Sequence, residues 1–134
     1  MTPRTVPATV LVAVALGGAL GAVLRWGCGE LVADGDGFPW TTFVVNVSGC
    51  LAIGLLPAVP GLPRRPVLTA ALGPGLLGGY TTMSAYAEQT RSLLADGQAW
   101  TAMAYLVGTL VACVGSVVLA DRLTGDDAAD VVEP

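Results

Sequence analysis

Charged residues divide this chain of 134 residues into long apolar stretches separated by short polar ones. Four stretches contain no charged residue: 5–24, 37–63, 66–87 and 97–120. A helix needs roughly 20 predominantly apolar residues to cross the ~30 Å hydrocarbon core of a bilayer. Each stretch is long enough for one crossing, so the pattern predicts an all-α membrane protein with four transmembrane helices.

Turn-forming residues and prolines set the ends of the predicted spans. Residues 33–39 form a connection rich in Asp and Gly, and three prolines follow the second span. The predicted spans are approximately Val6 to Leu31, Trp40 to Leu56, Pro66 to Ala95 and Gln98 to Leu123. No repeat of fixed period is visible, so we expect one membrane domain over 1–125 and a short acidic tail over 126–134.

The composition restricts the classes of function. Only 12% of the residues are charged and the mean hydropathy is +0.71, whereas soluble domains carry about 25% charged residues. Almost nothing remains outside the spans for a soluble domain. The chain has no His, which removes His-based acid–base chemistry, and no nucleophile–base pair indicates an enzyme. The net charge of −4 comes from the acidic tail, and no basic patch indicates a nucleic-acid partner.

Arginines are distributed unevenly between the two sides of the predicted bundle. With four spans, the two termini and the 57–66 connection share a side, which carries Arg4, Arg64, Arg65 and Arg122. The other side carries Arg25 and Arg91. The positive-inside rule therefore favours a multi-pass protein of the cell membrane with both termini in the cytoplasm. Because the bias is mild, insertion of some copies in the opposite orientation is also allowed.

Small residues recur at helix-face spacing within the spans. Residues four apart form a ridge of small side chains along one helix face. The first ridge is Gly17 and Gly21, and the second is Ala71, Gly75 and Gly79. The third ridge is Ala104, Gly108, Ala112, Ser116 and Ala120. In lipid, helices associate by close approach at such positions, either within one chain or between subunits. Four helices packed this closely leave no central pore, so a transport route needs a second chain or the bundle surface. The single cysteines, Cys28, Cys50 and Cys113, are predicted to be small core residues.

Polar groups inside the spans are functional candidates because they are costly to place in hydrocarbon. Asn46 lies among valines in the second span, and its amide serves either an interhelical hydrogen bond or a function. In the third span, 73–86 combines four glycines and Pro74 with a run of hydroxyl residues, which predicts a helix broken near the bilayer middle. We favour an ion site there over a simple kink. Neutral donors with the aromatic edges of Tyr80 and Tyr86 suit a small, strongly hydrated anion.

Three motifs in this order are similar to those of a known family. They are Gly17-Gly18-x-x-Gly21-Ala22-x-x-Arg25-Trp26, then Thr42-x-x-x-Asn46-x-x-Gly49, then Gly78-Gly79-Tyr80-Thr81-Thr82-Met83-Ser84. The chain resembles the CrcB/Fluc family of fluoride channels over about 17–122. The resemblance implies a passive channel that exports fluoride from the cytoplasm and confers fluoride resistance.

The resemblance also implies an assembly and a set of site residues. Family members are antiparallel dimers with two fluoride pathways at the interface and a sodium ion at the dimer centre. Main-chain carbonyls of Gly78 and Thr81 would hold that sodium. Residues of the fluoride pathway would be Asn46 as a donor, Ser84 as a hydroxyl, Arg25 near a vestibule, and further Thr42, Met83, Tyr86 and Tyr105.

The third motif departs from the family pattern Thr-Thr-Phe-Ser-Thr-Phe. Met83 stands in place of the first Phe, Ala85 in place of the second Thr, and Tyr86 in place of the second Phe. Homodimer and heterodimer therefore both remain open, and one alternative is a non-conducting partner of a homologous channel. A small proton-coupled drug exporter is less favoured, because it would need a buried carboxylate in the first span and 5–24 contains none.

Overall fold

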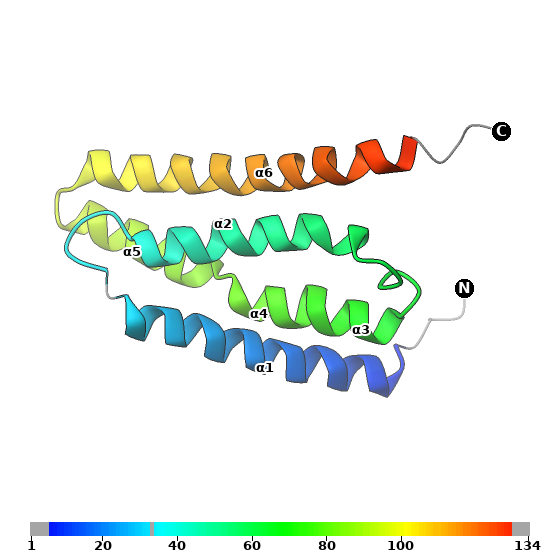
Figure 1. The fold of residues 1–134 in the computed structure, drawn as a ribbon. Coiled ribbons are helices and arrows are strands. Elements are labelled where there is room, and N and C mark those ends of the chain that lie inside the picture. The colour runs from blue at the N-terminus through cyan, green and yellow to red at the C-terminus, as the bar shows by residue number, and fades with distance from the viewer. Residues whose placement is uncertain (1–5, 33, 130–134) are drawn as a thin grey trace, which may run out of the picture.

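Figure 1 shows the fold in a computed structural model, which describes residues 6–32 and 34–129. Every regular element in these residues is helical. The elements are α1 (Ala8–Leu31), α2 (Trp40–Leu55), η1 (Leu56–Ala58), α3 (Pro66–Ala70), η2 (Ala71–Leu77), α4 (Gly78–Tyr80), α5 (Met83–Ala95) and α6 (Ala99–Ala129). The predicted all-α class is therefore confirmed.

Three helical segments are long and apolar enough to cross a membrane. They are Ala8–Leu31, Trp40–Ala58 and Ala99–Gly125, which match the first, second and fourth predicted spans. The third predicted span, from Pro66 to Ala95, is divided among α3, η2, α4 and α5. No one of these four segments alone has the length of a span.

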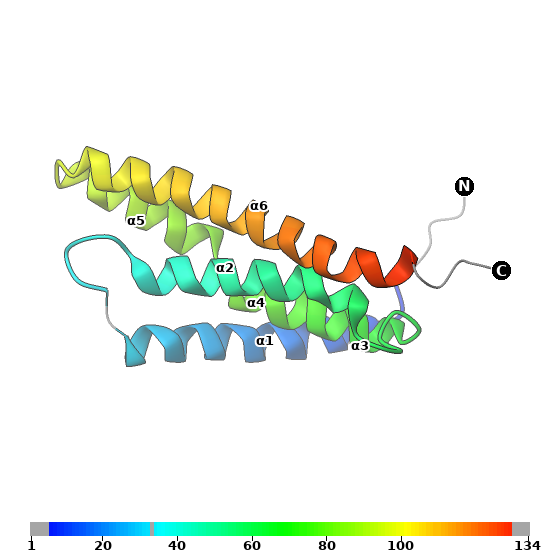
Figure 2. The ribbon, with the colours of Figure 1, turned by 45° about the horizontal axis from the view of Figure 1, so that its top comes forward.

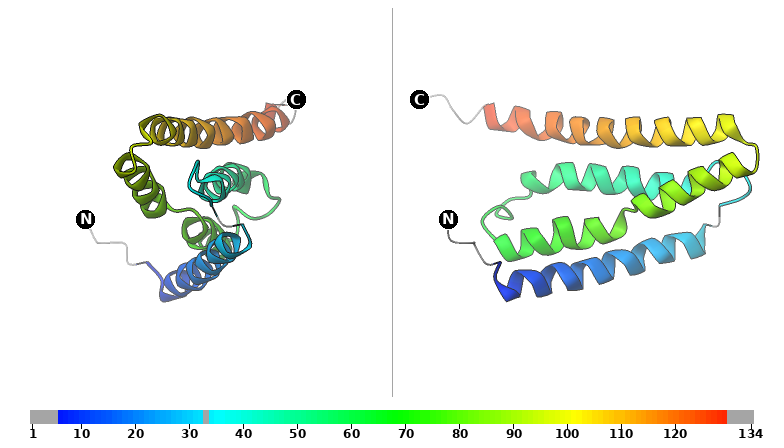
Figure 3. Two further views of the ribbon diagram at one scale, coloured as in Figure 1. Left: turned by 90° about the vertical axis from the view of Figure 1, so that its left-hand side faces the viewer. Right: turned by 180° about the vertical axis from the view of Figure 1, so that it is seen from behind.

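The helices lie side by side in an up-and-down arrangement. The start of α1, the end of α6 and the loop that contains η1 lie at one end of the bundle, and the α1–α2 and α5–α6 connections lie at the other (Figures 1 and 2). Seen from the end of the bundle, α2 lies between α6 and the pair that α1 forms with the α3–α4 segment (Figure 3). This arrangement places the start of α1 and the end of α6 on the same side of the bundle.

Glycines allow α1 to pack directly on the backbone of η2 and α4. A Cβ atom on Gly21 would collide with the Leu76 carbonyl, and one on Gly79 would collide with the Gly18 carbonyl. A Cβ on Gly75 would lie 3.1 Å from the Val14 carbonyl oxygen. Two of the predicted ridges therefore meet each other inside one chain, the first of the two alternatives considered for them.

Only part of the small-residue ridge on α6 packs against other helices of the chain. Ala120 is fully buried, and its Cβ lies where a side chain on Gly54 would have to fit. Towards the start of α6, Ala104 is exposed, and a Cβ on Gly108 would have no atom of the described residues within 4 Å. The first half of this ridge is therefore an open surface.

Large apolar side chains cover the outside of the bundle. Leu16 on α1 is 68% exposed, and Leu110 and Val111 on α6 are 62% and 64% exposed. In water such a surface would be unfavourable. In a bilayer it faces acyl chains, while helices satisfy the backbone polar groups internally.

Two helix ends differ from the sequence-based boundaries. A short 3₁₀ turn, η1, carries the second helical segment past Leu56 to Ala58, with Pro57 accepted at its first turn. The last helix continues past Leu123 to Ala129, into the segment predicted as a tail. No proline stands between Leu123 and Ala129 to end the helix.

Candidate functional site

The central feature of the site is an interruption of the backbone between α4 and α5. Thr81 (ψ 156°) and Thr82 (φ −145°, ψ 119°) are extended, and α5 begins at the next residue. The interruption follows η2, a π-helical stretch that contains Pro74. Proline supplies no N–H, and wide π turns occur often at functional sites. The glycine- and hydroxyl-rich sequence thus forms a local break in which Thr82 caps α5 by accepting from the Ala85 N–H.

The side chain of Asn46 on α2 holds this interruption. Its Nδ2 donates to the Thr82 carbonyl at 3.0 Å, and its Oδ1 accepts from the Thr82 N–H at 2.8 Å. The residue is only 8% exposed. An amide nitrogen carries two hydrogens, and only one of them is used in hydrogen bonds among the described residues. Asn46 therefore makes the interhelical bond considered from the sequence and keeps one N–H for a further acceptor.

The interruption also releases two main-chain carbonyls from their usual helical donors. In a continuous α-helix the Thr82 N–H would donate to the Gly78 carbonyl, and the Ala85 N–H would donate to the Thr81 carbonyl. Instead Thr82 donates to Asn46, and Ala85 donates to the Thr82 hydroxyl at 3.1 Å. These are the two carbonyls predicted to hold sodium. Neutral carbonyl oxygens of this kind are ligands suited to hard cations, so the donor set fits such an ion.

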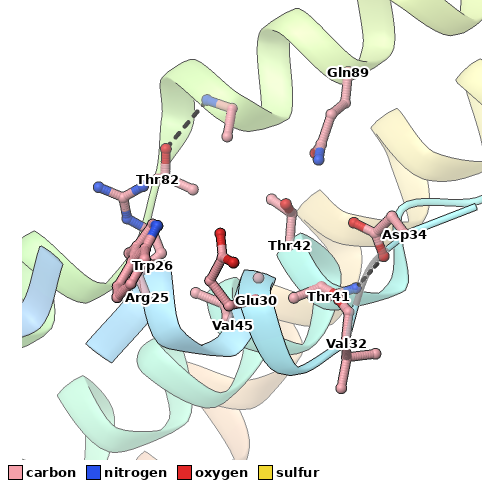
Figure 4. Close-up of a pocket in the computed structure, with 12 residues that line it drawn as sticks. Arg25, Trp26, Glu30, Val32, Asp34, Thr41, Thr42, Val45, Thr82 and Gln89 are labelled. Carbon is pink, nitrogen blue, oxygen red and sulfur yellow. Dashed lines mark hydrogen bonds between the residues drawn. The ribbon is translucent and has the colours of Figure 1, made fainter. Parts of the chain in front are cut away.

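A first cavity of about 310 Å³ opens beside Thr82 and includes the predicted residues Arg25 and Thr42 (Figure 4). The Arg25 Nε donates to the Gly79 carbonyl at 3.3 Å, which ties α1 to α4. The Glu30 carboxylate points into the cavity, and Gln89 extends towards it from α5. This cavity therefore combines one cation with carboxylates and neutral polar groups.

A second cavity of about 230 Å³ shares Thr82 with the first. It is lined by the predicted residues Asn46, Met83 and Tyr86, and it is mostly apolar apart from a few polar groups. Met83 is 77% exposed. The Tyr86 hydroxyl donates to the Leu106 carbonyl at 2.6 Å, which fixes its ring between α5 and α6.

Two predicted residues of the fluoride pathway lie outside both cavities. The Ser84 hydroxyl lies 3.3 Å from the Thr82 hydroxyl, at the start of α5. Tyr105 is fully buried, and its hydroxyl donates to Gln89 Oε1 at 2.8 Å. Its ring contacts Tyr86 with centroids 5.2 Å apart. Tyr105 therefore contacts one lining residue of each cavity, Gln89 in the first and Tyr86 in the second.

Thr109 on α6 is a site residue that the sequence analysis missed. It lines the second cavity, is 4% exposed, and its hydroxyl has no hydrogen-bond partner among the described residues. Buried polar atoms are nearly always satisfied, so this hydroxyl is available to a ligand. The sequence does hold a signal for this residue. Thr109 follows Tyr105 by four residues, so the two lie on the same helix face.

The cysteines also differ from the sequence-based expectation. Cys50 on α2 and Cys113 on α6 both line the second cavity, and their thiols lie next to each other. Neither is fully buried. Cys28 lies elsewhere, in a separate cavity with Trp40 and Tyr80. All three cysteines are partly exposed in this chain, so none of them lies in a closed core as predicted.

Comparison with known proteins adds a family to this geometry. The model of a family described as CrcB-like protein, Camphor Resistance (CrcB), matches residues 12–120. A protein of Nocardia farcinica named fluoride-specific ion channel FluC 2 is 43% identical over 82% of this chain and 81% of its own length. FluC 1 of Streptomyces coelicolor is 43% identical over 84% and 75%, and FluC of Paracoccus denitrificans is 42% identical over 78% and 86%.

Proposed function

Because this chain belongs to the CrcB family and is a multi-pass membrane protein, we propose that it is a subunit of a passive fluoride-selective channel. The channel exports fluoride across the cell membrane and thereby confers fluoride resistance. The observation that carries this proposal is the pairing of Asn46 with the interrupted backbone, in a cavity that also contains the Thr109 hydroxyl, which has no hydrogen-bond partner in the part of the chain that the structure describes. Relatives named as fluoride-specific channels support the choice of ion.

The site offers fluoride neutral hydrogen-bond donors in place of water. A small anion that leaves water loses strong hydrogen bonds, and burial without replacement donors is costly. The second N–H of Asn46 and the Thr109 hydroxyl supply such donors within one cavity. Neutral donors bind an anion without holding it as tightly as a full positive charge would, which suits conduction. Arg25 lines the first cavity, where its positive charge partly offsets the carboxylates of Glu30 and Asp34.

The conducting unit is an antiparallel dimer with its pathways between the two subunits. The exposure of Met83, next to the second cavity, and the open half of the α6 ridge support a second chain at this surface. Small residues allow close contact between helices in lipid. The dimer brings together two copies of this chain or this chain and a homologous four-span subunit.

A sodium ion at the dimer centre is held by the carbonyls of Gly78 and Thr81 and lies near the bilayer middle. The ion supplies a fixed positive charge that joins the two interrupted helices. A ligand that binds only the folded state adds about 2.7 kcal/mol at 100 times its dissociation constant. Replacing sodium with N-methylglucamine should therefore lower the Tm of the purified protein, while restoring sodium should recover it.

Both termini lie on the cytoplasmic side in the favoured orientation, and an opposite orientation of the partner completes the antiparallel pair. The start of α1 and the end of α6 lie at the same end of the bundle, which supports a shared side for the termini. The arginines of the termini and of the loop near η1 favour the cytoplasm.

The second candidate function is a non-conducting partner of a homologous channel. Met83 favours it, because a thioether replaces an aromatic ring beside the second cavity. A proton-coupled exporter has less support, because residues 8–24 of α1 contain no carboxylate.

Growth of a fluoride-sensitive bacterium that lacks its own channel tests the proposed function in cells. We expect expression of this chain alone to restore growth in fluoride. Failure to restore growth, with the protein present in the membrane, would contradict a self-sufficient channel. Restoration only with a co-expressed homologue would instead favour the partner function.

A further inference from the structure

Three sulfur-bearing side chains from three different helices line the second cavity. They are Cys50 of α2, Met83 of α5 and Cys113 of α6. The two thiols lie next to each other, and the thioether belongs to a side chain that is 77% exposed. The cavity therefore has Met83 at its edge and an adjacent thiol pair at its wall.

Thiolates and thioethers are the protein ligands that select soft metal ions such as Cu⁺. Cu⁺ accepts two or three sulfur ligands, and a pair of thiols with one thioether supplies three. The other polar groups on the wall, such as the Asn46 amide and the Thr109 hydroxyl, are neutral and are weaker ligands for a soft ion than sulfur. The cavity also has enough volume, about 230 Å³, for an ion that is far smaller than a drug-sized ligand.

We propose that Cys50, Cys113 and Met83 form a binding site for one Cu⁺ ion. Binding displaces a thiol proton to water and forms a Cu–S bond, with no change in the oxidation state of copper or sulfur. A first deprotonated thiol gives a neutral copper–thiolate unit, which the apolar cavity accepts more readily than a free cation. The second thiol sulfur and the Met83 thioether complete the ligand set.

Copper at this site would also affect transport, a consequence that rests on the proposed function. The same cavity contains Asn46 and Thr109, the two donors assigned to fluoride. An ion bound between the sulfur atoms occupies space beside these donors. Bound Cu⁺ should therefore reduce fluoride flux.

Cys28 provides a matched control within the same chain. It is partly exposed like the other two cysteines, but it lines a different cavity with Trp40 and Tyr80. A general affinity of cysteines for copper would involve Cys28 as well. Specific binding at Cys50, Cys113 and Met83 would not involve Cys28.

The direct test is competition for Cu⁺ between the purified full-length protein in detergent and the chromophoric chelator bathocuproine disulfonate, without oxygen and with ascorbate. We expect one Cu⁺ per chain. Since loss of even an outer-shell partner costs about 10- to 100-fold in metal affinity, Cys50→Ser and Cys113→Ser should each weaken binding by at least about tenfold. Cys28→Ser should leave it unchanged. Equal weakening by Cys28→Ser, or no binding by the wild type, would overturn the proposal.

A second test uses only the wild-type protein, so that a variant's failure to fold cannot obscure the result. The protein is alkylated with N-ethylmaleimide with and without Cu⁺, and the labelled peptides are measured by mass spectrometry. Copper should protect Cys50 and Cys113 while Cys28 is labelled to the same extent. Equal labelling of Cys50 and Cys113 in both conditions would overturn the proposal. Both binding tests are independent of flux, so they separate failure of this site from failure of the channel function.

Discussion

At the scale of single residues, two buried polar groups of the second cavity have opposite roles. Asn46 uses its amide on both backbone groups of Thr82, so it stabilises the interruption of the helix. Thr109 contributes a hydroxyl with no partner among the described residues, so it costs stability. A group kept at a cost to stability is a functional candidate. The two residues should therefore respond differently to substitution.

Asn46→Ala should reduce both stability and fluoride flux. It leaves the partly buried N–H and carbonyl of Thr82 without the Asn46 side chain as partner, whereas the full cost of about 1–3 kcal/mol applies to each unsatisfied group that is completely buried. Thermal unfolding and fluoride efflux measure the two effects. Ser48→Ala is the control, because Ser48 is an exposed polar residue on the same helix that lines neither cavity; its hydroxyl bonds to the Val45 carbonyl and lies 3.2 Å from the Tyr80 hydroxyl. A wild-type Tm and flux for Asn46→Ala would contradict the assigned role.

Thr109→Val should separate stability from function. Valine has nearly the shape of threonine but removes the unpartnered hydroxyl, so we expect the Tm to stay the same or rise. Flux should fall, because a donor for fluoride is lost. Thr109→Ser retains the hydroxyl and should retain most of the flux. If Thr109→Val carries fluoride as fast as the wild type, the hydroxyl has no part in conduction.

At the scale of the helices, the contact of α1 with η2 and α4 positions the interruption. Gly17 and Gly21 bring α1 onto the backbone of the third helical region, and Arg25 then reaches the Gly79 carbonyl. The sequence predicted the helical segments well, because apolar length and turn residues are local signals. The sequence left open whether the glycine ridges meet within the chain. The spacing of small residues defines a helix face, but it does not identify the helix that packs against that face.

Gly21→Ala should strongly destabilise the fold, whereas Gly27→Ala should not. A methyl group on Gly21 meets backbone atoms of Leu76 and Tyr80, which cannot move without separating the helices. A methyl group on Gly27 meets nothing in the described residues within 4 Å, and Ala in a helix is favoured over Gly by about 1 kcal/mol. Thermal unfolding in detergent compares the two. Equal Tm values would contradict the close packing of α1.

At the scale of the whole molecule, residues from several helices line the two cavities, and Thr82 lines both of them. The motifs predicted Arg25, Thr42, Asn46, Met83 and Tyr86 as site residues, and all five line one of the two cavities. The sequence could not reveal that Cys50 lies next to Cys113, or that Thr109 lines the same cavity as Asn46. These neighbours depend on which faces of α2 and α6 meet, a tertiary property that periodicity does not determine.

The purified protein should be a dimer in mild detergent. Its mass by light scattering, corrected for detergent, should be twice the 13.5 kDa of one chain. The exposed side of Met83 and the open half of the α6 ridge are the surfaces expected to be covered. Gly108→Trp places a large side chain on this ridge and should shift the protein towards monomer. A wild-type monomer at all concentrations would contradict the interface.

Fluoride efflux from liposomes that contain only this chain tests the central claim most directly. An electrode measures the fluoride released, and chloride-loaded vesicles serve as the control for selectivity. Fast release of fluoride with little release of chloride is the predicted result, since the chain would then supply the whole pathway. No release of fluoride from a folded, reconstituted sample, or equal release of both anions, would contradict the claim that this chain forms a fluoride-selective channel.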